Sequence, residues 1–410
     1  MNKLKAGRYA KLLVRSGLNV KKGQTVFVAA SVEQAEFAAM VVEECYRAGA
    51  KRVVMEWECD AVSKLDYAYQ SIETMFEVTP WAEAKLKYKA EDLSCRLFIE
   101  SSDPDAFRGA DMDKIAKARQ AQYPVIKPYR DKMENRHQWC IAAAAGKAWA
   151  KKLFPALSDK RAVDALWEKI FACSRADGPD PVKAWARHDD DLAKKCDRLN
   201  SLHLVSLEYK SGNGTDLKVG LNKDCVFMGG AERTLQGRAF NANIPSEEVY
   251  TSPMAGVAEG IVYATKPLSY QGQLIENFSV RFAGGKVVEV KAEKNEELLK
   301  KMVSMDEGAA MLGECALIPY DSPINNTGIL FYNTLFDENA SCHLALGAGF
   351  TNCLRGFEDL TQEECRKRGV NDSMIHVDFM IGSKDLSIVG VTAEGRRVQL
   401  FKDGNWAADL

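Results

Sequence analysis

The chain has 410 residues, and its 55 Lys and Arg residues nearly balance its 57 Asp and Glu residues, which gives a net charge of −2. This balance leaves no basic excess that would favour nucleic acid or an anionic membrane as a partner. The length is too great for one ordinary hydrophobic core. We therefore expect two domains, at residues 1–195 and 196–410.

The N-terminal residues and the cysteines indicate the compartment. The first residues, Met1 to Gly7, lack the apolar segment of a signal peptide, and no run approaches the length of a membrane span. The 11 cysteines are odd in number and contain no C-x-x-C pair, so they do not form a disulfide framework. Free cysteines fit a reducing compartment, and we expect a cytoplasmic protein.

The first half of the chain alternates segments with helical and strand periodicity. The predicted helices are Arg8–Ser16, Val32–Ala48, Met112–Gln122, Leu166–Arg175 and Leu192–Asn200. The predicted strands are Thr25–Ala30, Arg52–Trp57 and Arg96–Ser101, and Trp139–Ala145 is a further buried segment. Such alternation predicts an α/β domain with a parallel sheet. No G-x-G-x-x-G follows the first strand, so a dinucleotide is not indicated.

The second half has the pattern of antiparallel strands. Two hairpins are predicted around Ser211–Gly214 and Ala283–Gly285, and a helix is predicted at Glu296–Ala310. The C-terminal domain is therefore expected to be α+β and mainly antiparallel β.

His376 and Asp378 lie two residues apart in the apolar run Ser373–Ile381. Side chains in a strand alternate between its faces, so these two point in the same direction. An unpaired buried charge is costly, and a buried imidazole beside a carboxylate therefore needs a reason. Two interpretations fit: a metal site, or a hydrogen-bonded pair within the core.

Further acidic and imidazole side chains occur in apolar segments upstream. They are the pair Glu247 and Glu248, then Glu314, then Glu338 and His343. Two histidines with several carboxylates suit zinc, cobalt or manganese, and the carboxylates can bridge two ions. Paired ions activate water and polarise a carbonyl. The hypothesis from these residues is a two-metal hydrolytic site.

Four ordered segments resemble the thermophilic aminopeptidase family of dinuclear metallopeptidases, which includes aminopeptidases T and S (peptidase family M29). The segments are Asn243–Pro253, Gly313–Pro319, Glu338–Gly347 and His376–Gly382, and Tyr9–Gln24 is also similar to that family. The resemblance implies an N-terminal α/β domain, a C-terminal metallopeptidase domain and a homodimer. It also implies a metallo-aminopeptidase that acts on peptides with a free N-terminus.

The resemblance further implies a ligand set for two divalent metal ions (Zn, Co, Mn or Mg). The implied ligands are Glu248, Glu314, Glu338, His343, His376 and Asp378. Either Glu247 or Glu248 could face inward, because the two are adjacent. We favour Glu248 as the ligand and Glu247 as the general base that takes a proton from water.

Each motif also has a purely structural interpretation. Glu338 could cap the segment that follows it, Glu247 and Glu248 could be solvated, and Glu314 could pair with a buried arginine. Cys342 beside His343 could suggest a cysteine nucleophile, but adjacent strand residues point to opposite faces, and a core position is expected. His137 and His188 lie among charged residues and are expected to be solvated, while His203 is expected to pack in the core.

One position departs from the family pattern. A tyrosine follows the motif histidine by seven residues in the family and is thought to stabilise the tetrahedral intermediate, whereas Phe350 stands here. Losing such a donor typically costs on the order of 10²–10³ in rate. Tyr250, Tyr320, Tyr332 or Arg355 could substitute. Two alternatives therefore stay open: a metal- and peptide-binding protein with weak or no turnover, and a hydrolase of another amide.

Overall fold

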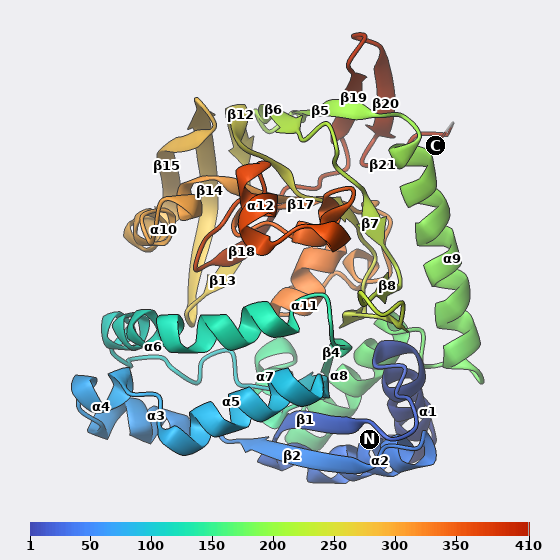
Figure 1. Cartoon of the computed structure of the whole chain (residues 1–410), viewed down its shortest axis with the longest axis vertical. Helices are drawn as coiled ribbons and strands as arrows, with labels where there is room; N and C mark the ends of the chain where they lie inside the picture. Colours follow the sequence, from blue (N-terminus) through green and yellow to red (C-terminus); the bar gives the residue numbers. More distant parts are fainter. Residues whose placement is uncertain (409) are drawn as a thin grey trace. The chain divides into compact units, whose positions relative to one another are not determined.

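The computed structural model describes residues 1–408 and 410, and these form two compact units (Figure 1). Unit 1 comprises Met1–Arg187 and Ala231–Pro245, and unit 2 comprises His188–Gly230 and Ser246–Leu410. Helix α9 (Pro181–Asn200) begins in unit 1 and ends in unit 2.

Unit 1 is built on a five-stranded parallel sheet with the strand order β10-β4-β3-β1-β2. The strands are β1 (Thr25–Ser31), β2 (Arg52–Glu58), β3 (Cys95–Glu100), β4 (Trp139–Ala143) and β10 (Asn243–Ile244). Six of the seven residues of β1 are buried, as expected for an inner strand covered on both faces. The prediction of a parallel α/β region is confirmed.

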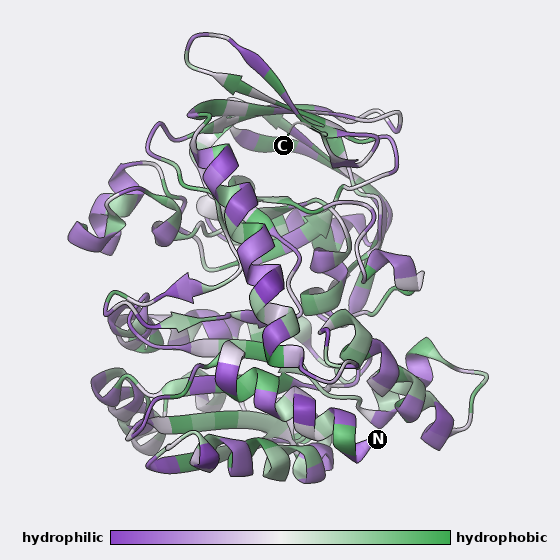
Figure 2. Ribbon diagram, turned by 90° about the vertical axis from the view of Figure 1, so that its right-hand side faces the viewer, coloured by the Kyte–Doolittle hydropathy of each residue, from purple (hydrophilic) through white to green (hydrophobic). Residues whose placement is uncertain are grey.

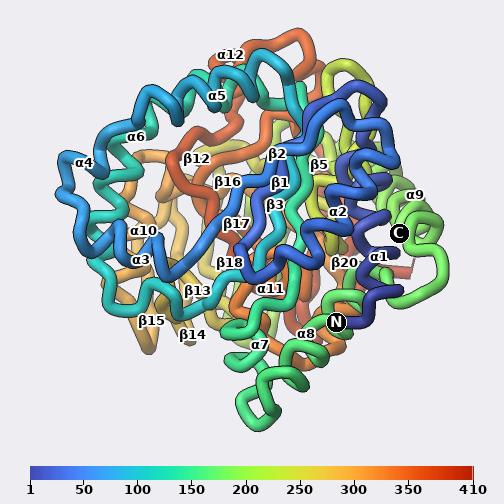
Figure 3. Tube along the Cα trace, turned by 90° about the horizontal axis from the view of Figure 1, so that it is seen from below, coloured from blue at the N-terminus to red at the C-terminus, as the bar shows by residue number. Residues whose placement is uncertain are grey.

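Helices cover this sheet on both faces. They are α1 (Lys3–Leu12), α2 (Ala35–Arg47), α3 (Asp60–Tyr69), α4 (Ile72–Phe76), α5 (Pro80–Asp92), α6 (Met112–Met133), α7 (Lys147–Leu153) and α8 (Asp159–Cys173). The chain moves from β1 to β2 in one direction and from β2 to β3 in the other, so right-handed crossovers place α2 and α5 on opposite faces. Figure 3 shows β1, β2 and β3 side by side, with α2 on one side and α5 and α6 on the other.

Two details of unit 1 differ from the sequence predictions. The helix predicted to end at Gln122 continues to Met133 through Pro124 and Pro128. This helix, α6, contacts α4 and α5, and that packing outweighs the local preference of proline. The segment Ala231–Pro245, which we assigned to the C-terminal domain, belongs to unit 1, because β10 within it extends the parallel sheet beside β4.

Unit 2 contains a nine-stranded antiparallel sheet with the order β13-β14-β12-β6-β5-β19-β20-β21, and β15 pairs with β14. Its strands are β5 (Leu204–Lys210), β6 (Asp216–Leu221), β12 (Pro253–Tyr263), β13 (Leu268–Tyr270), β14 (Gln273–Ala283), β15 (Lys286–Lys294), β19 (Ser387–Thr392), β20 (Arg397–Lys402) and β21 (Asn405–Trp406). Both predicted hairpins, β5–β6 and β14–β15, are present. The mainly antiparallel character of the second half is confirmed.

A second, five-stranded antiparallel sheet of unit 2 has the order β18-β17-β16-β11-β7. Its strands are β7 (Met228–Gly229), β11 (Val249–Thr251), β16 (Leu312–Leu317), β17 (His343–Gly347) and β18 (His376–Met380). The helices of unit 2 are α10 (Glu296–Val303), α11 (Thr334–Asp337) and α12 (Gln362–Lys367). Helix α10 is shorter than the predicted Glu296–Ala310. The remaining short strands, β8 (Glu232–Arg233) and β9 (Ala239–Phe240), pair with each other in unit 1.

Hydropathy follows this architecture. In Figure 2, α9, the long helix facing the viewer, is coloured mainly hydrophilic, whereas the strands carry both hydrophobic and hydrophilic stretches. Across residues 1–408 and 410, none of the helices combines the length and apolar character that a membrane crossing requires.

Candidate metal centre

The five-stranded sheet separates polar donors from apolar core on its two faces. In the register of the strands, Glu314 pairs with Ala345, which pairs with Asp378, and Ala316 pairs with His343. Because alternate residues share a face, Glu314, His343 and Asp378 lie on the same face. The opposite face packs into the apolar core of unit 2 through Cys315, Leu317, Leu344, Leu346 and Phe379.

Small residues and a bulge position the donors. Ala316 and Ala345 stand between the donors on their face and leave space for the longer acidic and imidazole side chains. The register of β16 and β17 shifts between Leu312 and Glu314, and a Cβ atom on Gly313 would overlap the carbonyl oxygens of Gly347 and Ala348. Such a bulge re-aims the next side chain, here Glu314.

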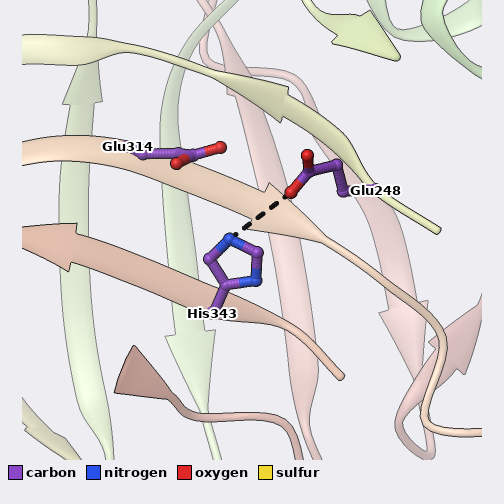
Figure 4. Close-up of side chains that lie close together, drawn as sticks. All are labelled: Glu248, Glu314 and His343. Atoms are coloured by element: carbon purple, nitrogen blue, oxygen red, sulfur yellow. Dashed lines mark ion pairs between the residues drawn. The ribbon is translucent and has the colours of Figure 1, made fainter. Parts of the chain in front are cut away.

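Figure 4 shows the first group of donors, Glu248, Glu314 and His343. One donor atom from each lies within 4.8 Å of the others, and all three side chains are buried. Nε2 of His343 is 3.5 Å from Oε2 of Glu248. Glu248 directly precedes β11, which pairs with β16, so strand pairing brings together donors 66 residues apart.

A second group consists of Glu314, His376 and Asp378, again with donor atoms within 4.8 Å of one another. Nε2 of His376 is 3.1 Å from Oε2 of Glu314 and 3.3 Å from Oδ1 of Asp378. The same Asp378 oxygen is 3.8 Å from Nε2 of His343. Glu314 therefore belongs to both groups, and Asp378 lies close to both histidines.

Backbone carbonyls fix the orientation of both imidazole rings. Nδ1 of His343 is 2.8 Å from the carbonyl oxygen of Glu338, and Nδ1 of His376 is 2.7 Å from that of Ala348. A carbonyl oxygen can only accept, so Nδ1 donates in both rings. Nε2 of each ring is thereby directed to the carboxylates, which is the usual orientation of a metal-binding histidine.

Burial and mutual repulsion perturb the ionisation of these groups. Glu338, in the buried 3₁₀ turn Glu338–Ala340, belongs to neither of the two groups of donors. Burial and then the charges of Asp378, Glu248 and Glu314 raise its pKa well above the usual value. Burial lowers the pKa of His376, but the carboxylates of Asp378 and Glu314 outweigh it and raise that pKa well above the usual value. Burial raises the pKa of Asp378, but the positive charge of His376 dominates and lowers it to about 2.

The donors have the chemistry that a divalent cation requires. Oδ1 of Asp378 is a buried oxygen that accepts no hydrogen bond from the residues that the structure describes. Carboxylates crowded in a buried site repel one another, and a cation would relieve that repulsion. Four carboxylates and two imidazoles form a ligand set that fits zinc, cobalt or manganese.

Glu247 and Glu248, which the sequence could not separate, point to different partners. The Glu248 carboxylate faces His343, whereas Oε2 of Glu247 lies 3.7 Å from Nε2 of His188. His188 was expected to be solvated, but its side chain is only 10% exposed, because α9 packs it against Ser246 and Glu247. No sequence signal marked it, since its neighbours along the chain are charged. His203, expected in the core, is exposed.

Phe350 and Tyr250 lie near His376, whereas Cys342 lies in the core. The Phe350 ring lies 4.9 Å from the His376 ring and 5.4 Å from the Tyr250 ring, measured between centroids. Of the residues that could replace the hydroxyl of the family tyrosine, Tyr250 is therefore one whose ring contacts Phe350. Cys342 is buried, its thiol contacts backbone atoms of Ile318, and burial raises its pKa to about 12. A thiol of this kind is an inert core residue rather than a nucleophile.

A cluster of carboxylates and imidazoles with donor atoms this close together is the kind of site that holds a divalent ion in metal-dependent enzymes. The chain belongs to the family of thermophilic metalloproteases M29, whose family model matches residues 2–406. The family resemblance of the ordered motifs and the prediction of an enzyme are therefore confirmed.

Relatives and solved structures agree with this assignment. The sequence is 43% identical to aminopeptidase AmpS of Bacillus subtilis (strain 168) over 98% of both chains, and 39% identical to aminopeptidase T of Thermus aquaticus over 97% of both. The structure of wild-type AmpT from Thermus thermophilus matches with a TM-score of 0.90 at 37% identity, covering 100% of both chains. A 2,5-dihydroxypyridine dioxygenase from Pseudomonas putida KT2440 shares the fold, with a TM-score of 0.53 and 12% identity, covering 100% of this chain and 98% of its own.

Proposed function

We propose that this protein is a metal-dependent aminopeptidase that releases N-terminal residues from peptides with a free N-terminus. Membership of the M29 family supports the proposal, as does similarity to aminopeptidases at 38–43% identity. The observation that carries it is the pair of donor groups that share Glu314. A carboxylate common to two sets of donors is suited to bridge two ions.

The proposed ligands are Glu248, Glu314, Glu338, His343, His376 and Asp378, and the ions are Zn, Co, Mn or Mg. When bound, two divalent ions would supply Lewis acidity, which acidifies water and polarises a peptide carbonyl. The chain's own contribution is to hold the donors rigidly, since Nδ1 of each histidine is fixed by a backbone carbonyl.

Glu247 is the proposed general base. Its carboxylate is buried and lies next to the ligand Glu248 in sequence. Its backbone N–H donates to Oδ1 of Asn339 at 2.8 Å, which holds the segment before β11 in place. In the proposed reaction, this carboxylate takes a proton from the attacking water and returns it to the leaving amine.

Assembly and location form part of the same proposal. We expect a homodimer, as the family resemblance implies, and a cytoplasmic location, as the free cysteines indicate. Light scattering coupled to gel filtration tests the dimer, which should have about twice the 45.5 kDa mass of one chain.

The activity is tested with dipeptides that have free or acetylated N-termini. The metal-chelated protein should be inactive, and adding zinc, cobalt or manganese should restore cleavage of the free dipeptides alone. His376→Ala should abolish the restored activity, whereas His203→Asn, a change at an exposed histidine, should leave it intact. Metal-independent cleavage, or equal cleavage of acetylated dipeptides, would overturn the proposal.

The phenylalanine at position 350 favours a second candidate function. Its ring lies beside His376 but carries no hydroxyl to donate to an oxyanion. A metal- and peptide-binding protein with weak or no turnover, or a hydrolase of another amide, would fit this feature. Stoichiometric metal binding without cleavage of any dipeptide would favour this second candidate over the aminopeptidase.

A further inference from the structure

Helix α9 carries a histidine that the ligand set does not include. Nε2 of His188 lies 2.7 Å from the carbonyl oxygen of Ser246 and 3.7 Å from Oε2 of Glu247. The carbonyl can only accept, so Nε2 carries a hydrogen. One N–H of His188 therefore binds the backbone of this segment and also faces the Glu247 carboxylate.

Asn339 holds the same segment through a different group. Its Oδ1 accepts the Glu247 N–H at 2.8 Å, and its Nδ2 donates to the Leu335 carbonyl at 3.0 Å and to Oε1 of Glu338 at 3.3 Å. Asn339 is fully buried. The backbone of Glu247 thus keeps an anchor that does not depend on His188.

Burial and the polar Nε2–H make the contact between His188 and Glu247 more than a packing contact. The side chains of His188 and Glu247 are only 10% and 7% exposed, so little water screens the attraction between the imidazole and the carboxylate. The next carboxylate along the chain, that of Glu248, faces His343 instead. The two adjacent acidic side chains are therefore held by two different histidines.

We infer that His188 is a positioning residue of this site: its Nε2–H orients the Glu247 carboxylate while Glu248 is directed to the donor cluster. This inference rests on the proposed function for its kinetic consequence but not for its structural one. Because Asn339 anchors the Glu247 backbone separately, removing the imidazole should displace the Glu247 side chain and leave the sheet folded.

The kinetic test compares His188→Ala with His188→Gln, whose side-chain amide can place an N–H near the position of Nε2. In the metal-loaded enzyme, His188→Ala should lower kcat about 10- to 100-fold, with KM changed less than about threefold and bound metal unchanged. His188→Gln should recover most of the loss. His203→Asn is the matched control, since Asn tolerates the left-handed backbone (φ 50°) of this exposed histidine.

A double-mutant cycle shows whether His188 acts through Glu247. In a Glu247→Gln background, His188→Ala should cause little further loss of kcat, because the group that it orients is already absent. Full additivity would overturn the inference, as would an unchanged kcat in His188→Ala or a His188→Gln variant as slow as His188→Ala.

Crystal structures supply a readout that does not need activity. The Glu247 carboxylate should be displaced or disordered in His188→Ala and should keep its place in His188→Gln and in the wild type. An unmoved Glu247 in His188→Ala overturns the inference even if the protein is an active aminopeptidase. An inactive wild type with a displaced Glu247 in His188→Ala would refute the proposed function and support the positioning role.

Discussion

Glu314 is the carboxylate that both groups of donors share, whereas Glu248 belongs to one group. Glu314→Gln replaces one charged oxygen with an amide and should therefore remove both ions of the proposed two-metal centre. Glu248→Gln should weaken one ion and leave the other. Elemental analysis after dialysis gives the metal-to-protein ratio, which should fall from about two to near zero and near one respectively.

Glu297→Gln, on the exposed face of α10, is the matched control and should retain both ions. The shared role of Glu314 is wrong if Glu314→Gln keeps two tightly bound ions.

Protons and cations should compete for this site. Without a metal, His376 and Glu338 both have pKa values well above their usual ranges, so both keep their protons to a higher pH than the free side chains do. A cation must displace these protons, and its affinity should rise with pH by up to about tenfold per pH unit for each proton released. Lowering the pH should weaken binding correspondingly.

Calorimetry in buffers with different ionisation enthalpies measures the protons released when zinc binds. A net release of protons should accompany zinc binding near pH 7. Binding that releases no proton and keeps one affinity from about pH 6 to pH 8 would contradict the assignment of these two groups.

Some residues of the site could be predicted from their neighbours in the sequence, and others could not. His376 and Asp378 could be placed on one face because strand alternation needs only their spacing. His188 could not be predicted, since its burial arises from the contact of α9 with a segment 58 residues away. Asn339 was missed for a similar reason: its amide anchors Glu247, and nothing in the neighbouring sequence indicates that partner.

At the scale of the element, β17 depends on its last residue. Gly347 has φ +106°, pairs with His376, and a Cβ atom there would overlap the carbonyl oxygen of Ile375. Gly347→Ala should destabilise the protein by about 2–4 kcal/mol and reduce metal binding, because β17 and β18 must separate. Chemical denaturation and metal titration measure the two effects.

Gly395→Ala is the control that separates the effect of the positive φ from the effect of the steric clash at Gly347. Gly395 also has a positive φ of +80°, but a Cβ atom there meets no atom within 4 Å. Gly395→Ala should lower the free energy of unfolding by only about 1 kcal/mol. Equal losses for the two glycines would show that backbone strain alone, and not the clash with β18, governs Gly347.

Element types were more predictable than element ends. Apolar runs identified β1 and β2 within a residue at each end, because a buried strand is marked by its own side chains. The end of α6 was predicted at Gln122, yet contacts with α4 and α5 extend that helix past two prolines to Met133. The two-residue strand β10 had no detectable pattern, since its place in the sheet is set by pairing with β4.

At the scale of the whole molecule, the donors all come from unit 2. A ligand that binds only the folded state at about 100 times its dissociation constant adds about 2.7 kcal/mol of stability. Chelation should therefore speed hydrogen exchange in β16, β17 and β18 up to about 100-fold, and leave β1 to β4 of unit 1 nearly unchanged.

Hydrogen exchange followed by mass spectrometry resolves these segments. The metal-free and zinc-loaded proteins should differ in peptides from Leu312 to Met380. A uniform change across both units would contradict a centre confined to unit 2, and no change would contradict metal binding by these strands.

In the five-stranded sheet, the candidate metal donors occupy one face and the core residues occupy the other. A point mutation that exchanges one donor for another alters the chemistry without opening a cavity in the core. Insertion or deletion of one residue within β16, β17 or β18 would exchange the two faces and damage both at once. We therefore expect substitution of a donor to change the metal preference of the proposed centre, and a change in the length of any of these three strands to disrupt both the centre and the core.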